Sequence, residues 1–328
     1  MKWTRLAALS LAVTAAAIAA GAVVTSRVAE NRARAAKAQY PPSGEFIDVD
    51  GRRVHAQVMG SGPDVVLIHG AFGSLQDFTY DLMPRLAERY RVIAFDRPGL
   101  GYSDRTDPAY AATFAPRGES PAEQAAMLAA AARKLGATEP IVVGHSFGGI
   151  VAMAWALDHD PAAVVTFAGV AMPWPGELGW LYQVNGTRLG GAVVAPLISA
   201  FVPQSRLDAA VPATFAPQPM PDGYAAHIGP YMPVRLGPFR ANARQVNHLR
   251  PFVVEMSARY PTLELPIELL HGDADETVPL TIHSAPLADI VDTANLAVMP
   301  GVGHMPHHVD PEAAVAAIDR AADRAGLH

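Results

Sequence analysis

Short runs of apolar, mostly β-branched residues alternate along this chain with longer helix-like segments. The apolar runs are VVLI (65–68), VIAF (92–95), IVV (141–143), VVTF (164–167), IELL (267–270) and NLAVM (295–299), and the helix-like segments are residues 78–89, 120–135, 146–158 and 311–325. Before them, FIDV (46–49) and RVHAQV (53–58) flank Asp50-Gly51, which predicts an opening hairpin. Because a strand covered on both faces has no polar side, continuous apolar runs predict buried parallel strands joined by helical crossovers. We therefore predict an α/β fold in which helices cover both faces of a mostly parallel central sheet.

The composition excludes several classes of function. The 328 residues carry 25 basic and 31 acidic side chains, for a formal charge of −6, and include no cysteine. A mildly acidic chain lacks the basic surface that nucleic acids require, so we expect no nucleic-acid partner. The missing cysteines exclude disulfides, thiolate nucleophiles and cysteine-ligated metal centres. Only 17% of the residues are charged, against about 25% in an ordinary globular protein, and this shortage needs a location.

Part of the shortage lies in the first 24 residues. Two basic residues precede an uncharged run of 19 residues, Leu6–Val24. At about 1.5 Å per residue, a helix of this length just spans a hydrocarbon core of about 30 Å. A cleaved signal peptide, with the small residues Ala20-Gly21-Ala22 at its cleavage site, is the alternative. The run is longer than the roughly 7–15 apolar residues of a signal peptide, which favours an uncleaved membrane anchor; basic residues on both flanks leave its orientation open.

One interval interrupts the alternation of strands and helices. Between Phe167 and Ile267 lie 99 residues with no clear strand and with 14 of the 29 prolines. Connections longer than about 15 residues are usually functional lids or disordered segments. Aromatic side chains argue against disorder here, among them Trp174, Trp180, Tyr182, Phe201, Tyr224, Tyr231 and Phe239. We therefore predict an inserted cap. The expected organisation is an anchor or signal at 1–24, a helical spacer at 25–44, the first part of the core at 45–167, the cap at 168–262 and the second part of the core at 263–328.

The segment after the strand IVV predicts a nucleophile. Gly144-His145-Ser146-Phe147-Gly148-Gly149 matches the pattern G-x-S-x-G between a strand and a helix. Its glycines let the chain turn sharply, so that the Ser146 hydroxyl projects above the edge of the sheet. The N–H of Phe147 faces the same point and can serve as an oxyanion donor. A serine that only caps a helix is the alternative, but the strand-to-helix context favours a nucleophile.

A serine hydroxyl needs a base, and the base needs an orienting acid. In sheets of this kind the chain order is Ser, then Asp or Glu, then His. The strand IELL runs into a turn that contains Asp273 and Asp275, and the last strand runs into a turn that ends at His304. Both turns lie at the carboxyl edge of the sheet, as Ser146 does, so His304 is the expected base and either aspartate can be its partner.

The second oxyanion donor is expected in the loop after the third strand, which reads His69-Gly70-Ala71-Phe72-Gly73-Ser74. The N–H of Ala71 is the first candidate, and that of Phe72 is the alternative. We expect His69 to hold this loop in place rather than to act as a base. The aspartates and histidines near the C-terminus show no helical His pair with an intervening Glu, and no GxxxxGK[ST] loop is present, so we expect neither a metal nor another cofactor.

Taken together, these motifs resemble the α/β-hydrolase superfamily, in its branch of epoxide hydrolases, haloalkane dehalogenases, cofactor-free haloperoxidases, C–C bond hydrolases and many esterases. The matching segments are HGAFGS (69–74), FDRPGLGYSDR (95–105), GHSFGG (144–149), HGDADETVP (271–279) and GVGHMPH (301–307). In those proteins the acid stands in a G-x-x-D turn, which corresponds to Asp275 rather than Asp273, and the base follows G-x-G, which corresponds to His304. Epoxide hydrolases and dehalogenases use an aspartate nucleophile where this chain has Ser146.

The resemblance therefore implies the serine branch of the superfamily and acyl transfer through an acyl-serine. We expect a serine hydrolase that acts on a small-molecule, apolar ester and contacts the membrane through its N-terminal segment. Perhydrolase (haloperoxidase-like) chemistry, lactone opening and C–C bond hydrolysis could use the same triad and are the alternatives. A non-catalytic binding protein on the same fold is the remaining one, and the intact order of Ser146, Asp275 and His304 argues against it.

Overall fold

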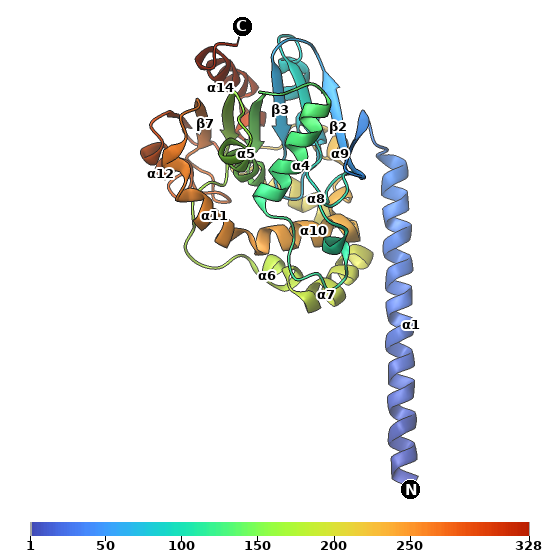
Figure 1. The fold of residues 1–328 in the computed structure, drawn as a ribbon. Coiled ribbons are helices and arrows are strands. Elements are labelled where there is room, and N and C mark those ends of the chain that lie inside the picture. Colours follow the sequence, from blue (N-terminus) through green and yellow to red (C-terminus); the bar gives the residue numbers. More distant parts are fainter. Residues whose placement is uncertain (1, 328) are drawn as a thin grey trace.

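The computed structural model describes residues 2–327, so Met1 and His328 lie outside the described chain (Figure 1). Its centre is an eight-stranded sheet with the strand order β1-β2-β4-β3-β5-β6-β7-β8. The strands are β1 (Glu45–Val49), β2 (Arg52–Met59), β3 (Asp64–Ile68), β4 (Arg91–Phe95), β5 (Ile141–His145), β6 (Ala163–Phe167), β7 (Ile267–Gly272) and β8 (Ala294–Met299). Strand β2 pairs antiparallel with both β1 and β4. The remaining pairs, in the order β4-β3-β5-β6-β7-β8, are parallel. The predicted α/β fold with a mostly parallel sheet is confirmed.

Helices cover both faces of the sheet, which explains why the central strands β3, β4, β5 and β6 are largely apolar and buried. In β3, Val66 and Ile68 pack with the helices α4 (Pro121–Lys134) and α5 (Phe147–Asp158). Val65 and Leu67 point the other way and pack with α3 (Leu82–Leu86) and α14 (Pro311–Arg324). Successive side chains of a strand alternate between its two faces, so each strand contributes to both cores.

The predicted helix over residues 78–89 is wrong. The chain forms two short helices instead, α2 (Gln76–Thr79) and α3, with a break at Tyr80 and Asp81. Pro84 accounts for the break, because it has no N–H to donate to the carbonyl of Tyr80 and its ring would clash with that carbonyl in a continuous helix.

Between β6 and β7 the chain forms helices and loops. The helices are α6 (Trp180–Gly186), α7 (Arg188–Phe201), α8 (Gln204–Ala213), α9 (Tyr224–Ile228), α10 (Leu236–Asn247) and α11 (Leu249–Ser257), with the 3-10 turns η2 (Met232–Val234) and η3 (Tyr260–Thr262). Helices α6, α7 and α10 pack on one another and lie below the sheet in Figure 1. The remaining helical segments are η1 (Pro108–Ala111), α12 (Ser284–Ile290) and α13 (Pro306–Val309).

The N-terminus forms one continuous helix, α1 (Lys2–Gln39), whose first half projects away from the rest of the molecule (Figure 1). Its length and apolar composition are sufficient to cross a membrane, and the apolar stretch is almost wholly exposed. A membrane anchor and a signal sequence share these properties. The second half of α1 packs against the rest of the molecule, where Thr25, Ala29 and Ala36 are buried.

Candidate active site

Ser146 stands at the sharp turn between β5 and α5, in a conformation that favours glycine. Its φ is 53° and its ψ is −118°, a backbone arrangement that costs a non-glycine residue on the order of 1–3 kcal/mol. The turn is closed tightly by its neighbours: a Cβ at Gly144 would lie 2.2 Å from the carbonyl oxygen of Gly148, and a Cβ at Gly148 would lie 2.0 Å from that of Ile68. These glycines allow the backbone to approach closely, and strained residues of this kind concentrate at functional sites.

The structure brings three of the predicted residues into one hydrogen-bonded chain. His304 Nε2 lies 3.0 Å from Ser146 Oγ, and His304 Nδ1 lies 2.7 Å from Asp275 Oδ2. Asp275 follows β7 and His304 follows β8, so the three side chains come from adjacent parts of the same sheet edge. All three are buried. This is the hydroxyl–imidazole–carboxylate geometry in which the imidazole can take the serine proton while the carboxylate holds its tautomer.

Asp275 is held in its ionised form by several donors. The N–H groups of Thr277 and Val278 donate to its Oδ1, at 2.8 and 2.9 Å, and His271 Nε2 lies 3.3 Å from its Oδ2. Burial works to raise the pKa of Asp275, but the contacts with His271 and His304 and the Val278 N–H outweigh it and hold the pKa well below its usual range. Asp275 therefore carries a charge next to His304 at neutral pH.

Asp273, the other aspartate of this turn, does not contact His304. Its side chain is exposed and accepts a hydrogen bond of 2.6 Å from the N–H of Gly301. It closes the turn after β8, while Asp275 points into the site.

The three candidate oxyanion donors are in different states. Within residues 2–327, no hydrogen-bond acceptor is found for the N–H of Ala71 or Phe147. The N–H of Phe72, in contrast, donates to Asn242 Oδ1 of α10 at 2.9 Å. The N–H groups of Ala71 and Phe147 are therefore without an acceptor in the described chain, while that of Phe72 fixes the loop to α10.

His69 holds this loop from below. The N–H of Arg97 donates to His69 Nε2 at 2.9 Å, and His69 Nδ1 lies 2.8 Å from the carbonyl oxygen of Gly70. Burial and the nearby Arg97 lower the pKa of His69 to about 4, so its ring is neutral. Arg97 Nη2 donates to the same Gly70 oxygen at 3.1 Å, and its Nη1 donates to Gln245 Oε1 of α10 at 3.1 Å. Asn242 and Gln245 were not indicated by the sequence, because no local pattern shows which loop a helix 170 residues away will contact.

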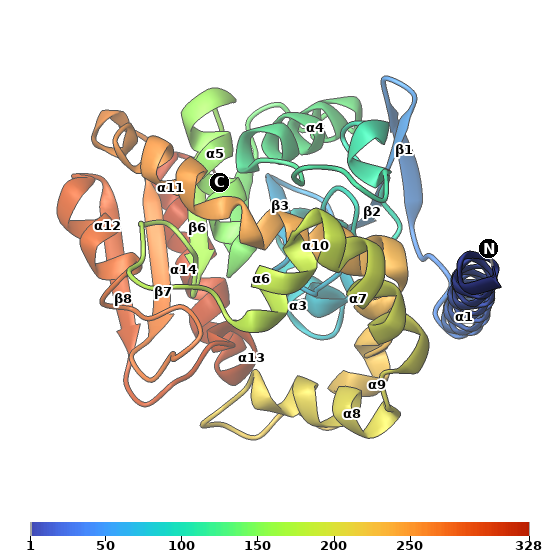
Figure 2. The same ribbon diagram turned by 90° about the horizontal axis from the view of Figure 1, so that it is seen from below.

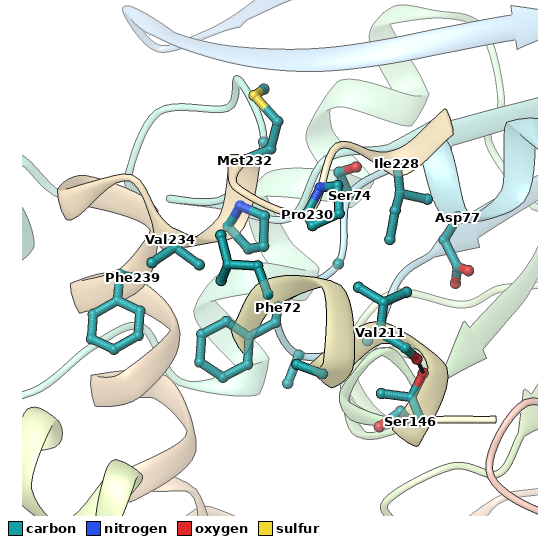
Figure 3. A pocket seen from close by; sticks show the side chains of 18 of the residues that line it. Phe72, Ser74, Asp77, Ser146, Val211, Ile228, Pro230, Met232, Val234 and Phe239 are labelled. Carbon is teal, nitrogen blue, oxygen red and sulfur yellow. Dashed lines mark hydrogen bonds between the residues drawn. The ribbon is translucent and has the colours of Figure 1, made fainter. Parts of the chain in front are cut away.

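A cavity of about 410 Å³ opens beside the hydroxyl of Ser146. Ser146 and His304 form part of its wall, and most of the remaining wall is apolar. Figure 3 shows Val211 near Ser146, Ile228 beside Ser74 and Asp77, and Phe72 and Phe239 side by side further along, with ring centroids 5.8 Å apart. The apolar wall comes from α6 to α10 and η2, through Leu181, Ile198, Val202, Leu207, Val211, Ile228, Pro230, Met232, Val234 and Phe239.

A second cluster of imidazoles surrounds Asp77 of α2. His308 Nε2 lies 2.8 Å from Asp77 Oδ1, which also accepts a hydrogen bond of 2.6 Å from the hydroxyl of Tyr224. His307 Nε2 and His145 Nδ1 lie 3.4 and 3.7 Å from Asp77 Oδ2. Burial works to raise the pKa of Asp77, but these imidazoles hold it well below its usual range, while burial lowers the pKa of His307 to about 4.

In the described chain, three residues of this second cluster lie close enough together to share a metal ion. One ligand atom each from Asp77, His145 and His307 lies within 4.8 Å of the other two. No local sequence pattern indicates Asp77, which stands in a helical segment far along the chain from His145 and His307. His145 also contacts the first site, since its Nε2 lies 3.0 Å from the carbonyl oxygen of His304.

Comparisons with known proteins agree with this architecture. The model of the alpha/beta hydrolase family matches residues 65–318. The uncharacterized protein Rv2715 of Mycobacterium tuberculosis is 26% identical over 294 residues, which cover 86% of this chain and 82% of that protein. The crystal structure of an alpha/beta hydrolase fold protein from Burkholderia ambifaria has 25% identity and a TM-score of 0.66, and covers 84% of this chain and 96% of its own.

One solved structure extends the likeness to the N-terminal helix. It is described as a bacterial membrane phospholipase A, and it covers 98% of this chain and 99% of its own at a TM-score of 0.60 and 20% identity. The eight-stranded sheet, the serine at the strand-to-helix turn and the family match over residues 65–318 lead to one conclusion. The chain belongs to the alpha/beta hydrolase family.

Proposed function

We propose that this protein is a serine hydrolase that cleaves carboxylic esters through an acyl-serine intermediate, with Ser146, His304 and Asp275 as its catalytic triad. The observation that carries the proposal is the hydrogen-bonded chain from Ser146 Oγ through His304 to Asp275 at the wall of an apolar cavity. A carboxylate–imidazole pair alone is common in proteins, but its extension to a strained serine beside a cavity is the arrangement that activates a hydroxyl nucleophile.

The steps follow from the positions of these groups. His304 Nε2 takes the proton of Ser146 as Oγ attacks the ester carbonyl, and Asp275 stabilises the imidazolium that forms. The N–H groups of Ala71 and Phe147 donate to the oxyanion, where one such donor typically contributes about 10²–10³ in rate. His304 then gives its proton to the leaving alcohol, and water repeats the sequence to release the acid. The scheme uses no cofactor.

The cavity favours an apolar substrate. Residues 168–262 supply most of its wall, and we propose that they form a cap domain over the sheet edge. Because the wall near Ser146 is largely aliphatic and aromatic, an apolar acyl or alcohol group gains free energy by leaving water there.

The test is hydrolysis of a panel of esters, lactones and dienoates by the wild-type protein and by Ser146→Ala. We expect apolar esters to be cleaved fastest. The kcat of Ser146→Ala should fall by a factor of at least about 10³ while the variant remains folded. Preferential cleavage of a lactone or a C–C bond would change the substrate class. Unchanged ester hydrolysis by Ser146→Ala would overturn the mechanism.

We also propose that α1 anchors the protein in a membrane without being cleaved. The uncharged run Leu6–Val24 and the continuity of α1 into the body support this proposal. Intact-mass measurement of the protein from membranes is the test: the full mass is expected, and a mass lacking about 22 residues would show that the segment is a signal peptide.

A further inference from the structure

The outer surface of α6 and α7 carries a row of exposed apolar side chains. Leu189, Val193, Leu197 and Phe201 follow one another at intervals of four residues on α7, which places them on one side of the helix. Leu189 is 73% exposed. Trp180 and Val184 of α6 are exposed in the same way, and these six residues are called the α6–α7 apolar face below.

The opposite side of α7 contacts the cavity. Ile198 and Val202 lie in the cavity wall, so a single helix separates the cavity from the α6–α7 apolar face. Arg206 and Ala210 of α8 and Thr214, which directly follows α8, also line the cavity, yet all three are exposed. The cavity therefore reaches the surface along α8, the helix that follows α7 in the chain (Figure 2).

The N-terminal helix is fixed to α7. Thr25, Ala29 and Ala36 of α1 are buried, and α1 packs along α7. Arg32 Nη1 donates to two carbonyl oxygens at the end of α7, those of Ala200 at 3.0 Å and Val202 at 2.9 Å. The last carbonyls of a helix lack partners within it, so the guanidinium of Arg32 satisfies them and ties the two helices together.

This attachment determines where a membrane would lie. Among the α1 residues whose burial the structure describes, Thr25 is the first buried one, and it directly follows the uncharged run Leu6–Val24. That run of 19 residues is about 28 Å long as a helix, close to the roughly 30 Å of a hydrocarbon core, so no linker separates the bilayer from the body. In Figure 1, α6 and α7 are the part of the body nearest to the projecting half of α1.

We propose that the α6–α7 apolar face rests in the surface of the lipid bilayer that α1 enters, and that the enzyme takes apolar esters from this bilayer through the opening along α8. The inference rests on the proposed esterase function and anchor. The bilayer is the partner that the geometry favours, because it already surrounds the adjoining segment of α1. Apolar side chains at this depth are stabilised by contact with the acyl chains.

The absence of native cysteine allows a direct test of the contact. The full-length chain is labelled with an environment-sensitive fluorophore at Val193→Cys or, as a control, at Val298→Cys and is placed in phosphatidylcholine vesicles. Val298 is also an exposed valine, but it lies in β8, beside β7 in the upper part of Figure 1. Lipids with a nitroxide on the acyl chain should quench the label at Val193 and leave the label at Val298 bright.

Equal quenching at the two positions would overturn the proposal. So would a buried but unquenched label at Val193 together with cross-linking between two Val193→Cys chains, because a second copy would then cover the face. This readout does not depend on catalysis, so it is separate from a failure of the proposed function.

A second test measures delivery of the substrate. Val193→Glu should hydrolyse a long-chain ester dissolved in phosphatidylcholine vesicles roughly tenfold more slowly than the wild type, because a charge weakens the bilayer contact. Its rate on a short, water-soluble ester should stay unchanged, as should both rates of Val298→Glu. Equal losses on the two substrates would contradict delivery from the membrane, whereas no hydrolysis of either ester by the wild type would refute the proposed function.

Discussion

Two assemblies of carboxylate and imidazole lie near each other at the carboxyl edge of the sheet. They differ in the groups that the imidazole and the carboxylate contact. In one, the two nitrogens of His304 meet Asp275 and Ser146, so a proton has a path from the hydroxyl to the ring. In the other, Asp77 contacts His308 and the hydroxyl of Tyr224.

The residue types alone therefore do not distinguish a catalytic assembly from a structural one. Both aspartates are buried, and contacts with imidazoles hold the pKa of each below its usual range. The distinction lies in the partner of the second ring nitrogen. Beyond its carboxylate, His304 has the strained serine, whereas neither ring nitrogen of His307 has a hydrogen-bond partner among residues 2–327. We infer that the Asp275 assembly performs chemistry and that the Asp77 assembly supports the structure around it.

The largest difference is expected between the two aspartate-to-asparagine variants. Asp275→Asn should lower kcat by about 10⁴, because the amide no longer favours the tautomer in which His304 Nε2 can accept the proton. Steady-state kinetics on an apolar ester measures the loss, with circular dichroism to show that the variant is folded. A drop of less than about tenfold would remove Asp275 from the mechanism.

Asp77→Asn should have the opposite profile. It weakens the buried hydrogen bonds with Tyr224 and His308, so we expect the free energy of unfolding to fall by about 1–3 kcal/mol. The kcat of the folded fraction should stay within about tenfold of the wild type, since Asp77, although it lies in the cavity wall, forms no hydrogen bond or ion pair with Ser146 or His304 in the described chain. Urea denaturation and kinetics on the same sample test both statements. A loss of kcat as large as that of Asp275→Asn would show that the Asp77 assembly also takes part in the chemistry.

The Asp77 assembly should also make the free energy of unfolding depend on pH, through His307. Burial lowers the pKa of His307 to about 4 from its ordinary value of 6.5, so the unfolded chain binds more protons between these two values. The stability that comes from the neutral ring is complete above pH 6.5 and is lost as the pH falls toward 4, by about 1.4 kcal/mol per pH unit for one proton. Urea denaturation across this range should show the slope in the wild type and a smaller slope in His307→Phe. Equal slopes would contradict the assignment.

The smallest effect is expected at Asn242. Its Oδ1 accepts from the N–H of Phe72 and fixes the loop that carries Ala71, the proposed oxyanion donor. Asn242→Ala should lower kcat several-fold and leave KM nearly unchanged, because it loosens an oxyanion donor without altering the cavity near the acyl group. Asn295→Ala is the matched control, since Asn295 makes its hydrogen bond to Glu268, far from Ser146. A similar loss of kcat in both variants would indicate a general effect on the fold.

The sheet could be predicted from the sequence because its strands are covered on both faces. Runs such as VVLI contain no polar residue, and only buried strands require that. The start of α4 also follows from a local pattern, a capping box: Ser120 Oγ accepts from the N–H of Glu123, whose side chain accepts from the N–H of Ser120. The break between α2 and α3 has a local signal as well, because Pro84 interrupts a continuous helix.

The candidate site divides in the same way. Ser146 belongs to a motif whose function depends on local backbone geometry, so its position can be predicted from six consecutive residues. Asp77 and Asn242 act through contacts with residues more than 140 positions away. Such contacts depend on how helices pack in three dimensions, and neither residue stands in a local pattern that predicts them.

If Ser146 is an activated nucleophile, it should react with a fluorophosphonate, a reagent that modifies activated serines. Labelling of the full-length protein followed by mapping of the modified peptide measures this reaction. We expect one adduct on Ser146 in the wild type and in Asp77→Asn, and none in Ser146→Ala. Folded wild-type protein that does not react, or an adduct that persists in Ser146→Ala, would contradict this expectation.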